Sequence, residues 1–182
     1  RALAACLLVV FASFSEITPA QPAGTWVLVD TPALQVSVMH RDEVLRTFEN
    51  IAIGSNGTTR QKRVADERTP LGDYRISEIR RSRRFHLFLG LNYPTMNDAK
   101  RALGDGRIDA GEFTRIRAAL QRGDRAPHDT SLGGNLGLHG IGHGNPDIHA
   151  RFNWTNGCIA LTNEQIDALA ALVTVGTPVR IR

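Results

Sequence analysis

Apolar and polar residues alternate along several short stretches of the chain, which are separated by Gly, Asn, Asp and Pro. Alternation with a period of two is typical of β-strands that bury one face. Strands therefore dominate the predicted fold. The pattern predicts them at residues 26–30, 34–40, 43–53, 74–79, 85–91, 136–141, 158–161 and 178–181.

Three segments have the features of helices instead. Residues 97–103 and 110–122 form a predicted helical hairpin between strands, and Thr162 with Gln165 forms a capping box for a helix that reaches residue 172. These elements predict a mainly β fold with α insertions, an antiparallel β-sandwich or barrel with two to three helices. We expect the helical hairpin to form one wall of a cleft, with Tyr93 at its entrance.

The first residues have a different character. Residues 2–14 are almost entirely apolar, about the length of a signal-peptide core and too short for a membrane span, and the small residues of Thr18-Pro19-Ala20 follow. We therefore predict a signal peptide and short linker over residues 1–24, one folded domain over residues 25–182, and export to the periplasm. Two alternatives are lipid attachment at Cys6 and retention of the apolar run as an anchor.

Composition limits the class of protein and the class of partner. With 42% hydrophobic and 22% charged residues and no repeat, the 182 residues suit one globular domain with a hydrophobic core. The net charge of +4 favours anionic partners. Basic clusters at 60–63 and 80–84 carry few aromatic residues and no recognition motif. We therefore predict no nucleic-acid partner and assign them to solvated surface or to attraction for anionic wall polymer.

Removal of the signal peptide would leave Cys158 as the only thiol of the mature chain, so that an internal disulfide is impossible. Cys158 stands where polar residues and Gly157 give way to an apolar run, which places the thiol at a loop-to-strand junction. Because Gly permits a tight turn, we expect the amides of Gly157 and Cys158 to point at a substrate oxygen, with the Asn156 side chain as a further donor. The alternative is a buried, inert cysteine.

A histidine lies upstream of this thiol, within the predicted strand at 136–141. Cysteine becomes a good nucleophile when an imidazole takes its proton, so His139 is the candidate base for Cys158. No acidic residue stands beside His139, and we expect the carbonyl of Gly140 to fix its tautomer. The alternative is a histidine whose ring is satisfied by backbone groups in a core strand.

These residues resemble the signature of the L,D-transpeptidases with a YkuD-type catalytic domain. The matching positions are His139-Gly140, Thr155, Gly157, Cys158 and Ile159, the Thr-Pro-Leu-Gly-Asp-Tyr run at 69–74, and the tail at 175–181. The resemblance implies an enzyme without a cofactor that forms a thioester at Cys158 with peptidoglycan stem peptides. The acceptor would be another stem, an envelope lipoprotein or a D-amino acid. We expect a monomer whose Tyr93, His143, Trp154 and Thr155 contact the substrate.

Two positions depart from the family pattern. The family usually has His where this chain has Asn156, and Arg where it has Ala160. Asn156 cannot titrate near neutral pH, and Ala160 cannot clamp a carboxylate. The departures resemble a YafK-like branch of the family, at least one member of which is a hydrolase. The alternatives are therefore an L,D-carboxypeptidase or amidase that hydrolyses the same class of bond, and a noncatalytic wall-binding module.

Several possible zinc ligands also lie near the cysteine in sequence. They are His139, His143, Asp147, His149 and Cys158. The Gly-rich spacing of the first two does not place them on one helix face, and the usual Glu base is absent. A calcium-loop pattern at 105–113 lacks two carboxylates. We therefore predict no metal and expect His149 to be solvated.

Overall fold

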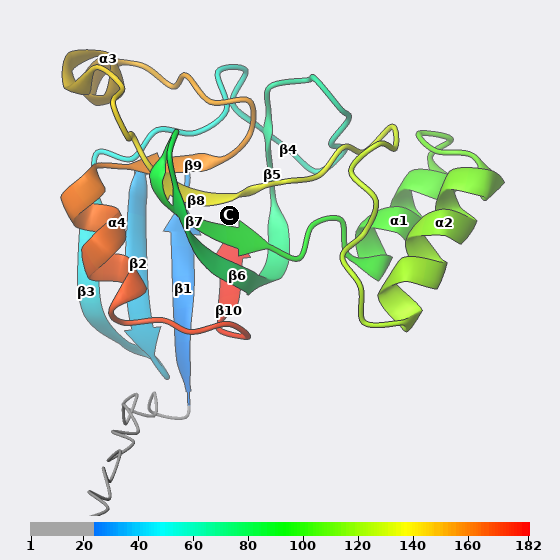
Figure 1. The fold of residues 1–182 in the computed structure, drawn as a ribbon, viewed down its shortest axis with the longest axis horizontal. Helices are drawn as coiled ribbons and strands as arrows, with labels where there is room; N and C mark the ends of the chain where they lie inside the picture. The colour runs from blue at the N-terminus through cyan, green and yellow to red at the C-terminus, as the bar shows by residue number, and fades with distance from the viewer. Residues whose placement is uncertain (1–23) are drawn as a thin grey trace, which may run out of the picture.

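The computed structural model of the protein describes residues 24–182, and Figure 1 shows their arrangement. The Cys6 acylation site and all but the last residue of the predicted signal peptide and linker lie outside the described residues. Within residues 24–182, every helix is too short or too polar to cross a membrane.

One large mixed sheet holds most of the strands, in the order β3-β2-β1-β10-β6-β7-β8-β9. Its members are β1 (Thr25–Asp30), β2 (Gln35–His40), β3 (Glu43–Glu49), β6 (Gly72–Ser82), β7 (His86–Leu91), β8 (Gly137–Gly140), β9 (Ile159–Leu161) and β10 (Pro178–Ile181). A separate pair consists of β4 (Thr58–Thr59) and β5 (Thr69–Pro70). The alternation that predicted β1 from the sequence is also its burial pattern, since every second side chain of this strand is buried.

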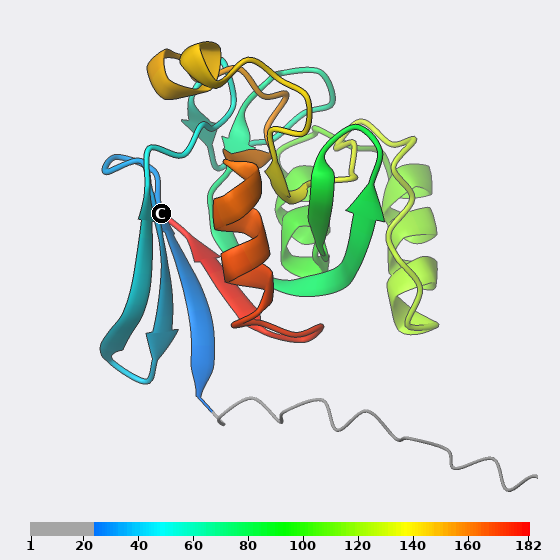
Figure 2. The same ribbon diagram turned by 60° about the vertical axis from the view of Figure 1, so that its left-hand side comes forward.

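The large sheet bends along its longest strand. The first residues of β6 pair with β10 and the later ones with β7, and the register shifts between Ile76 and Glu78. Such an irregularity bends a strand and increases its twist. The two halves of the sheet consequently stand on either side of helix α4 (Asn163–Ala170), as Figure 2 shows. Ala52, which follows β3, closes the arrangement through two backbone hydrogen bonds with Ala160 of β9, with N···O distances of 3.0 and 2.8 Å.

Helix α4 begins at the predicted capping box. The Thr162 hydroxyl accepts from the Gln165 amide at 3.2 Å, and the Gln165 side chain accepts from the Thr162 amide at 3.0 Å. Ile166 and Leu169 are fully buried on its inner face and join the core formed by both halves of the sheet. This packing, more than helix propensity, holds an eight-residue helix in place.

The predicted helical hairpin is α1 (Met96–Gly104) and α2 (Ala110–Gln121), which lie together at one side of the sheet (Figure 1). Thr95 and Asp98 form a capping box for α1, and the Asp109 carboxylate accepts from the Glu112 amide at the start of α2. A further helix, α3 (Pro146–Arg151), lies between β8 and β9 in the chain.

The predicted fold class is confirmed, with corrections in detail. The sheet is mixed rather than antiparallel, because β1 pairs in parallel with β10 and β8 with β9. The described residues form four helices rather than two to three, and α3 is the one that was not predicted. The strand predicted at 43–53 ends at Glu49, because Asn50 adopts a left-handed conformation (φ 57°) and redirects the chain toward β9.

Candidate active site

Cys158 lies directly before β9, with its side chain partly buried. Its thiol donates to the carbonyl oxygen of Asn135, which lies 3.8 Å from Sγ. Burial raises the pKa of the Cys158 thiol to about 11, although the Gly137 amide and the Lys62 ammonium act in the opposite direction. The resting thiol is therefore neutral near pH 7, and a base is needed to produce the thiolate.

The turn that presents the thiol is built on one threonine. The Thr155 hydroxyl donates to the Cys158 carbonyl at 2.6 Å and accepts from the Gly157 amide at 3.1 Å. Gly157 has a φ of 122°, and a Cβ at this position would lie 2.6 Å from the Arg68 carbonyl oxygen. The turn thus requires glycine. The Gly157 amide is already engaged, in contrast to the predicted role of this amide as an oxyanion donor.

His139 lies on β8, where only 1% of its surface is exposed. Its Nδ1 is 2.8 Å from the carbonyl oxygen of Gly140. Because a carbonyl can only accept, Nδ1 carries the proton of the neutral ring and Nε2 carries the lone pair. Burial lowers the pKa of His139 to about 4, the Gly140 hydrogen bond opposes this change, and the Arg84 charge adds to it. The ring is therefore neutral near pH 7 and can accept a proton at Nε2.

The imidazole and the thiol lie on one face of the sheet. The parallel ladder pairs His139 with Ala160, and Cys158 precedes Ala160 by two residues, the spacing at which strand side chains return to the same face. Both line a cavity of about 250 Å³, together with Arg84, Phe85, Phe88, Gly134, Asn135, Leu136, Trp154, Thr155 and Asn156. Two larger cavities, of about 610 and 580 Å³, contain neither residue. The smaller cavity is therefore the candidate active site.

Aromatic rings surround the imidazole. The Phe85 ring lies against it, with centroids 4.1 Å apart and an interplanar angle of 31°. The rings of Phe88 and Trp154 lie 6.4 and 6.0 Å away. These rings exclude water from His139, which explains the burial that keeps the ring neutral. The guanidinium of Arg84 in turn lies 5.0 Å from the centre of the Phe85 ring.

A family model of the L,D-transpeptidase catalytic domain, YkuD, matches residues 24–181. The chain belongs to this YkuD family. The family resemblance found in the sequence is thereby confirmed, whereas the YafK-like branch stays a prediction.

Solved structures share the YkuD fold at low sequence identity. Bd1075 from Bdellovibrio bacteriovorus has a TM-score of 0.55 and 20% identity, over 87% of this chain and 48% of that one. The helical cell shape determining protein Pgp2 from Campylobacter jejuni has a TM-score of 0.59 and 17% identity, over 87% and 47%. An L,D-transpeptidase from Xylanimonas cellulosilytica has a TM-score of 0.51 and 14% identity, over 91% and 63%. This chain thus spans about half the length of the first two proteins, and identities this low show the fold alone. A comparison with curated protein sequences finds no match.

The YkuD domain brings together some of the predicted substrate-contacting residues and separates others. Trp154, Thr155 and Asn156 line the cavity beside Cys158. His143 lines the 580 Å³ cavity instead, on the side of the β6–β7 hairpin. Tyr93 is buried in the core, where its hydroxyl donates to the Leu132 carbonyl at 3.3 Å. Tyr93 and His143 are therefore not part of the pocket that holds the thiol.

His149 is a correction to the prediction of a solvated side chain. It lies on α3 with only 6% of its surface exposed, and its Nδ1 accepts from the Trp154 indole N–H at 3.4 Å. The residues beside His149 in the chain are exposed, so the local sequence contains no signal for its burial. The contact forms because α3 places His149 beside Trp154. Within residues 24–182, no three His, Cys, Asp or Glu side chains lie close enough together to hold a metal ion.

Sequence reasoning missed two groups of pocket residues. Arg84, Phe85 and Phe88 come from the β6–β7 hairpin, and residues 134–136 form the loop before β8. The glycines and asparagine at 133–135 were a visible turn signal directly before the His139 strand. Nothing in the local sequence links the hairpin to the thiol, because the pairing of β7 with β8 brings them together.

Lys62 does not line this cavity, and its burial corrects the assignment of this member of the basic cluster to solvated surface. Only 6% of Lys62 is exposed. Its ammonium forms an ion pair with Asp66 and lies 3.5 Å from the Asn156 carbonyl oxygen. This charge lies beside the turn that presents the thiol and favours the thiolate of Cys158.

Proposed function

We propose that this domain is an exported cysteine L,D-transpeptidase that acts on peptidoglycan stem peptides through a thioester at Cys158. The observation that carries the proposal is the placement of a thiol and a neutral imidazole on one face of the sheet in a single pocket, with Nδ1 of His139 held by the Gly140 carbonyl. That hydrogen bond leaves Nε2 as the basic atom. Membership of the YkuD family supports the choice of reaction class and substrate.

In the first half-reaction, Nε2 of His139 takes the thiol proton and Sγ of Cys158 attacks a stem carbonyl that joins an L-centre to a D-amino acid. The resulting oxyanion is held by the amide of Cys158 and the side chain of Asn156. The Gly157 amide is not counted among these donors, because Thr155 already accepts from it. The C–N bond then breaks, the leaving amine takes the proton from His139, and a D-amino acid departs from the thioester.

In the second half-reaction, a nucleophile attacks the thioester while His139 takes its proton, and the sulfur leaves and regains a proton from the imidazolium. An amine from another stem, a lipoprotein lysine or a free D-amino acid gives transpeptidation. Water gives an L,D-carboxypeptidase or amidase. The aromatic rings that line the pocket favour the amine, because they limit the water beside the thioester.

Acylation by a carbapenem tests the nucleophile. Its strained β-lactam carbonyl opens on attack by a thiolate, so the intact mass of the protein is expected to rise by the mass of one drug molecule. The Cys158→Ala variant is expected to show no increase. Wild-type protein that gains no mass, or a variant that gains as much as wild type, would overturn the proposal and favour the noncatalytic wall-binding alternative.

Mass spectrometry of muropeptides then separates the two fates of the thioester. Purified sacculi are treated with wild-type protein or with Cys158→Ala, and the released and digested fragments are compared. Transpeptidation predicts new crosslinked or amine-substituted stems in the wild-type sample only. Shortened stems without any new amide bond would replace the transpeptidase with the hydrolase.

A further inference from the structure

The candidate active site contains one permanently charged side chain. Arg84 lines the cavity, whereas its other lining residues are neutral near pH 7, and none is acidic. Among residues 24–182, Arg84 takes part in no ion pair, and its guanidinium is placed by its contact with the Phe85 ring. A free cation at the mouth of an otherwise neutral pocket attracts an anionic ligand.

The distances suit an anion close to the reacting carbonyl. The guanidinium carbon of Arg84 lies 5.0 Å from the Phe85 centroid, and that centroid lies 4.1 Å from the His139 centroid. The guanidinium therefore lies within about 9 Å of the catalytic imidazole. Arg84 and Cys158 line the same cavity, and one residue of extended chain spans roughly 3.6 Å. The exposed guanidinium is therefore placed to meet a carboxylate one residue beyond a scissile bond held at Cys158.

β9 has no cationic side chain, so a cation in the pocket has to come from another element of the fold. The family usually has an arginine at the position of Ala160, which here is fully buried and bonded through its backbone to Ala52. β9 therefore offers no guanidinium to the pocket. Arg84 approaches the same pocket from the β6–β7 hairpin and has the fork of donors that matches a carboxylate.

We propose that Arg84 binds the free α-carboxylate of the single D-amino acid that leaves when Cys158 is acylated. Arg84 is then a specificity-determining residue that selects donor stems ending one residue beyond the scissile bond. This inference rests on the proposed function and adds to it the ligand class, a peptide with a C-terminal carboxylate. Stems that continue further, or that end in an amide, would lack the partner for Arg84.

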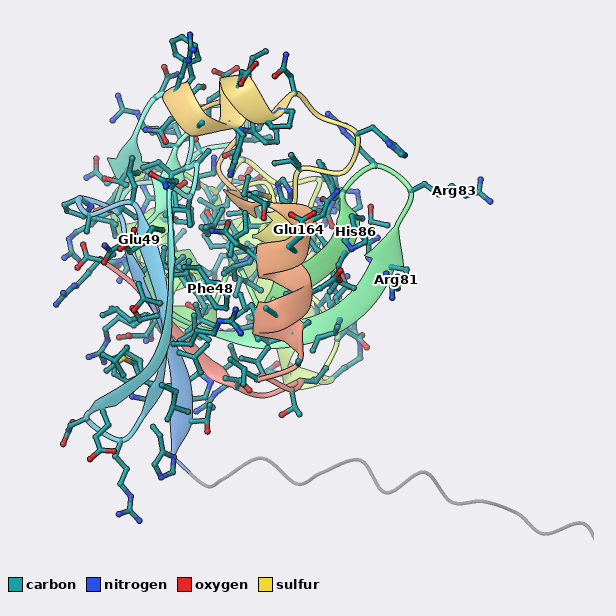
Figure 3. The ribbon with its side chains drawn as sticks, turned by 90° about the vertical axis from the view of Figure 1, so that its left-hand side faces the viewer. Phe48, Glu49, Arg81, Arg83, His86 and Glu164 are labelled. Atoms are coloured by element: carbon teal, nitrogen blue, oxygen red, sulfur yellow. The ribbon has the colours of Figure 1, made fainter. Side chains whose placement is uncertain are left out.

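The neighbouring arginine provides a matched control. Arg83 stands on the same turn but lines the cavity of about 580 Å³, and Figure 3 shows it projecting away from the body of the domain. Arg83→Gln removes the same charge from the same hairpin without altering the lining of the Cys158 pocket. Because Arg84 is exposed, Arg84→Gln is expected to fold, and circular dichroism confirms this for each variant.

The test compares two synthetic stem tetrapeptides, one ending in D-alanine and one in D-alanine amide. Release of D-alanine or its amide gives kcat/KM for each, and the quantity of interest is their ratio. Arg84→Gln is expected to lower the acid-to-amide ratio about tenfold, mainly through KM, the scale of a charged hydrogen bond at a partly open site. Arg84→Lys is expected to keep part of the ratio, and Arg83→Gln all of it.

The ratio separates recognition from indirect effects. The Arg84 charge also acts on His139, so that its loss changes the base for both peptides equally and cancels in the ratio. A ratio that is unchanged in Arg84→Gln, or lowered as much in Arg83→Gln, would refute the role of Arg84 while leaving the proposed function intact. Wild-type protein that cleaves neither peptide and is not acylated by a carbapenem would refute both.

Discussion

The buried state of His139 predicts a specific loss of stability in mild acid. The pKa of His139 is lowered by burial from 6.5 to about 4 in the folded protein. Between these values the unfolded chain binds a proton that the folded protein does not, so stability falls as the pH falls. At pH 5.0 the unfolded imidazole is almost fully protonated and the folded one is almost fully neutral. Relative to pH 7.5, the loss at pH 5.0 is about 2 kcal/mol from this residue alone.

Urea unfolding followed by tryptophan fluorescence at the two pH values measures this loss. The His139→Asn variant keeps a nitrogen that can donate to the Gly140 carbonyl, but it does not titrate. We expect its free energy of unfolding to be lower than that of wild type at pH 7.5 because the ring contacts with Phe85 are lost. We also expect its further decrease between pH 7.5 and 5.0 to be smaller than that of wild type by about 2 kcal/mol.

A second buried histidine provides the control. Burial also lowers the pKa of His149, which contributes to the wild-type slope but is unchanged in His139→Asn. Carboxylates contribute little, because pH 5.0 lies above their ordinary pKa values. The reasoning is refuted if His139→Asn and wild type lose the same free energy between the two pH values, which would mean that His139 is hydrated in the folded protein.

Three further outcomes follow from the contacts around the pocket. Burial raises the pKa of Cys158 to about 11, so alkylation by iodoacetamide should accelerate about tenfold per pH unit from pH 7 to 10, and a plateau below pH 9 would contradict this burial. Thr155→Val should lower the free energy of unfolding by about 1–3 kcal/mol and slow acylation by a carbapenem, because the hydroxyl that bonds to the Cys158 carbonyl and the Gly157 amide is lost. Thr155→Ser keeps the hydroxyl and should retain both the stability and the acylation rate. Lys62→Met should cost about 2 kcal/mol in urea unfolding because Asp66 loses its buried partner, and the neighbouring change Arg63→Met should cost little.

The parts of the fold that depend on local sequence were predictable. The alternation that predicts β1 and β2 coincides with their alternating burial, and the capping box at Thr162 marks the start of α4. α3 was missed because its six residues are mostly exposed, so that no apolar periodicity distinguishes them from a loop. β6 extends three residues beyond the predicted end because Arg80 and Arg81 pair with β7 through their backbones, which the polarity of their side chains conceals.

The candidate site also has one part that the local sequence predicts and another that it does not. Cys158, His139 and the Gly140 carbonyl lie within two short motifs, and the sequence names all three. Their environment comes from distant segments. Phe85 lies 4.1 Å from the His139 ring although 53 residues separate them in the chain, and this contact depends on the pairing of β7 with β8.

That environment changes the chemistry that the motifs alone suggest. An exposed imidazole beside a thiol favours a resting ion pair, in which the cysteine is already a thiolate. Here the pKa of His139 falls to about 4 and that of Cys158 rises to about 11, so both groups are neutral before substrate binds. In the proposed mechanism, proton transfer then accompanies attack on the carbonyl, at the moment when the developing oxyanion and the bound substrate stabilise the separated charges. The hairpin that supplies Phe85 and Arg84 therefore links the proposed recognition of a carboxylate to the proton transfer that activates the thiol.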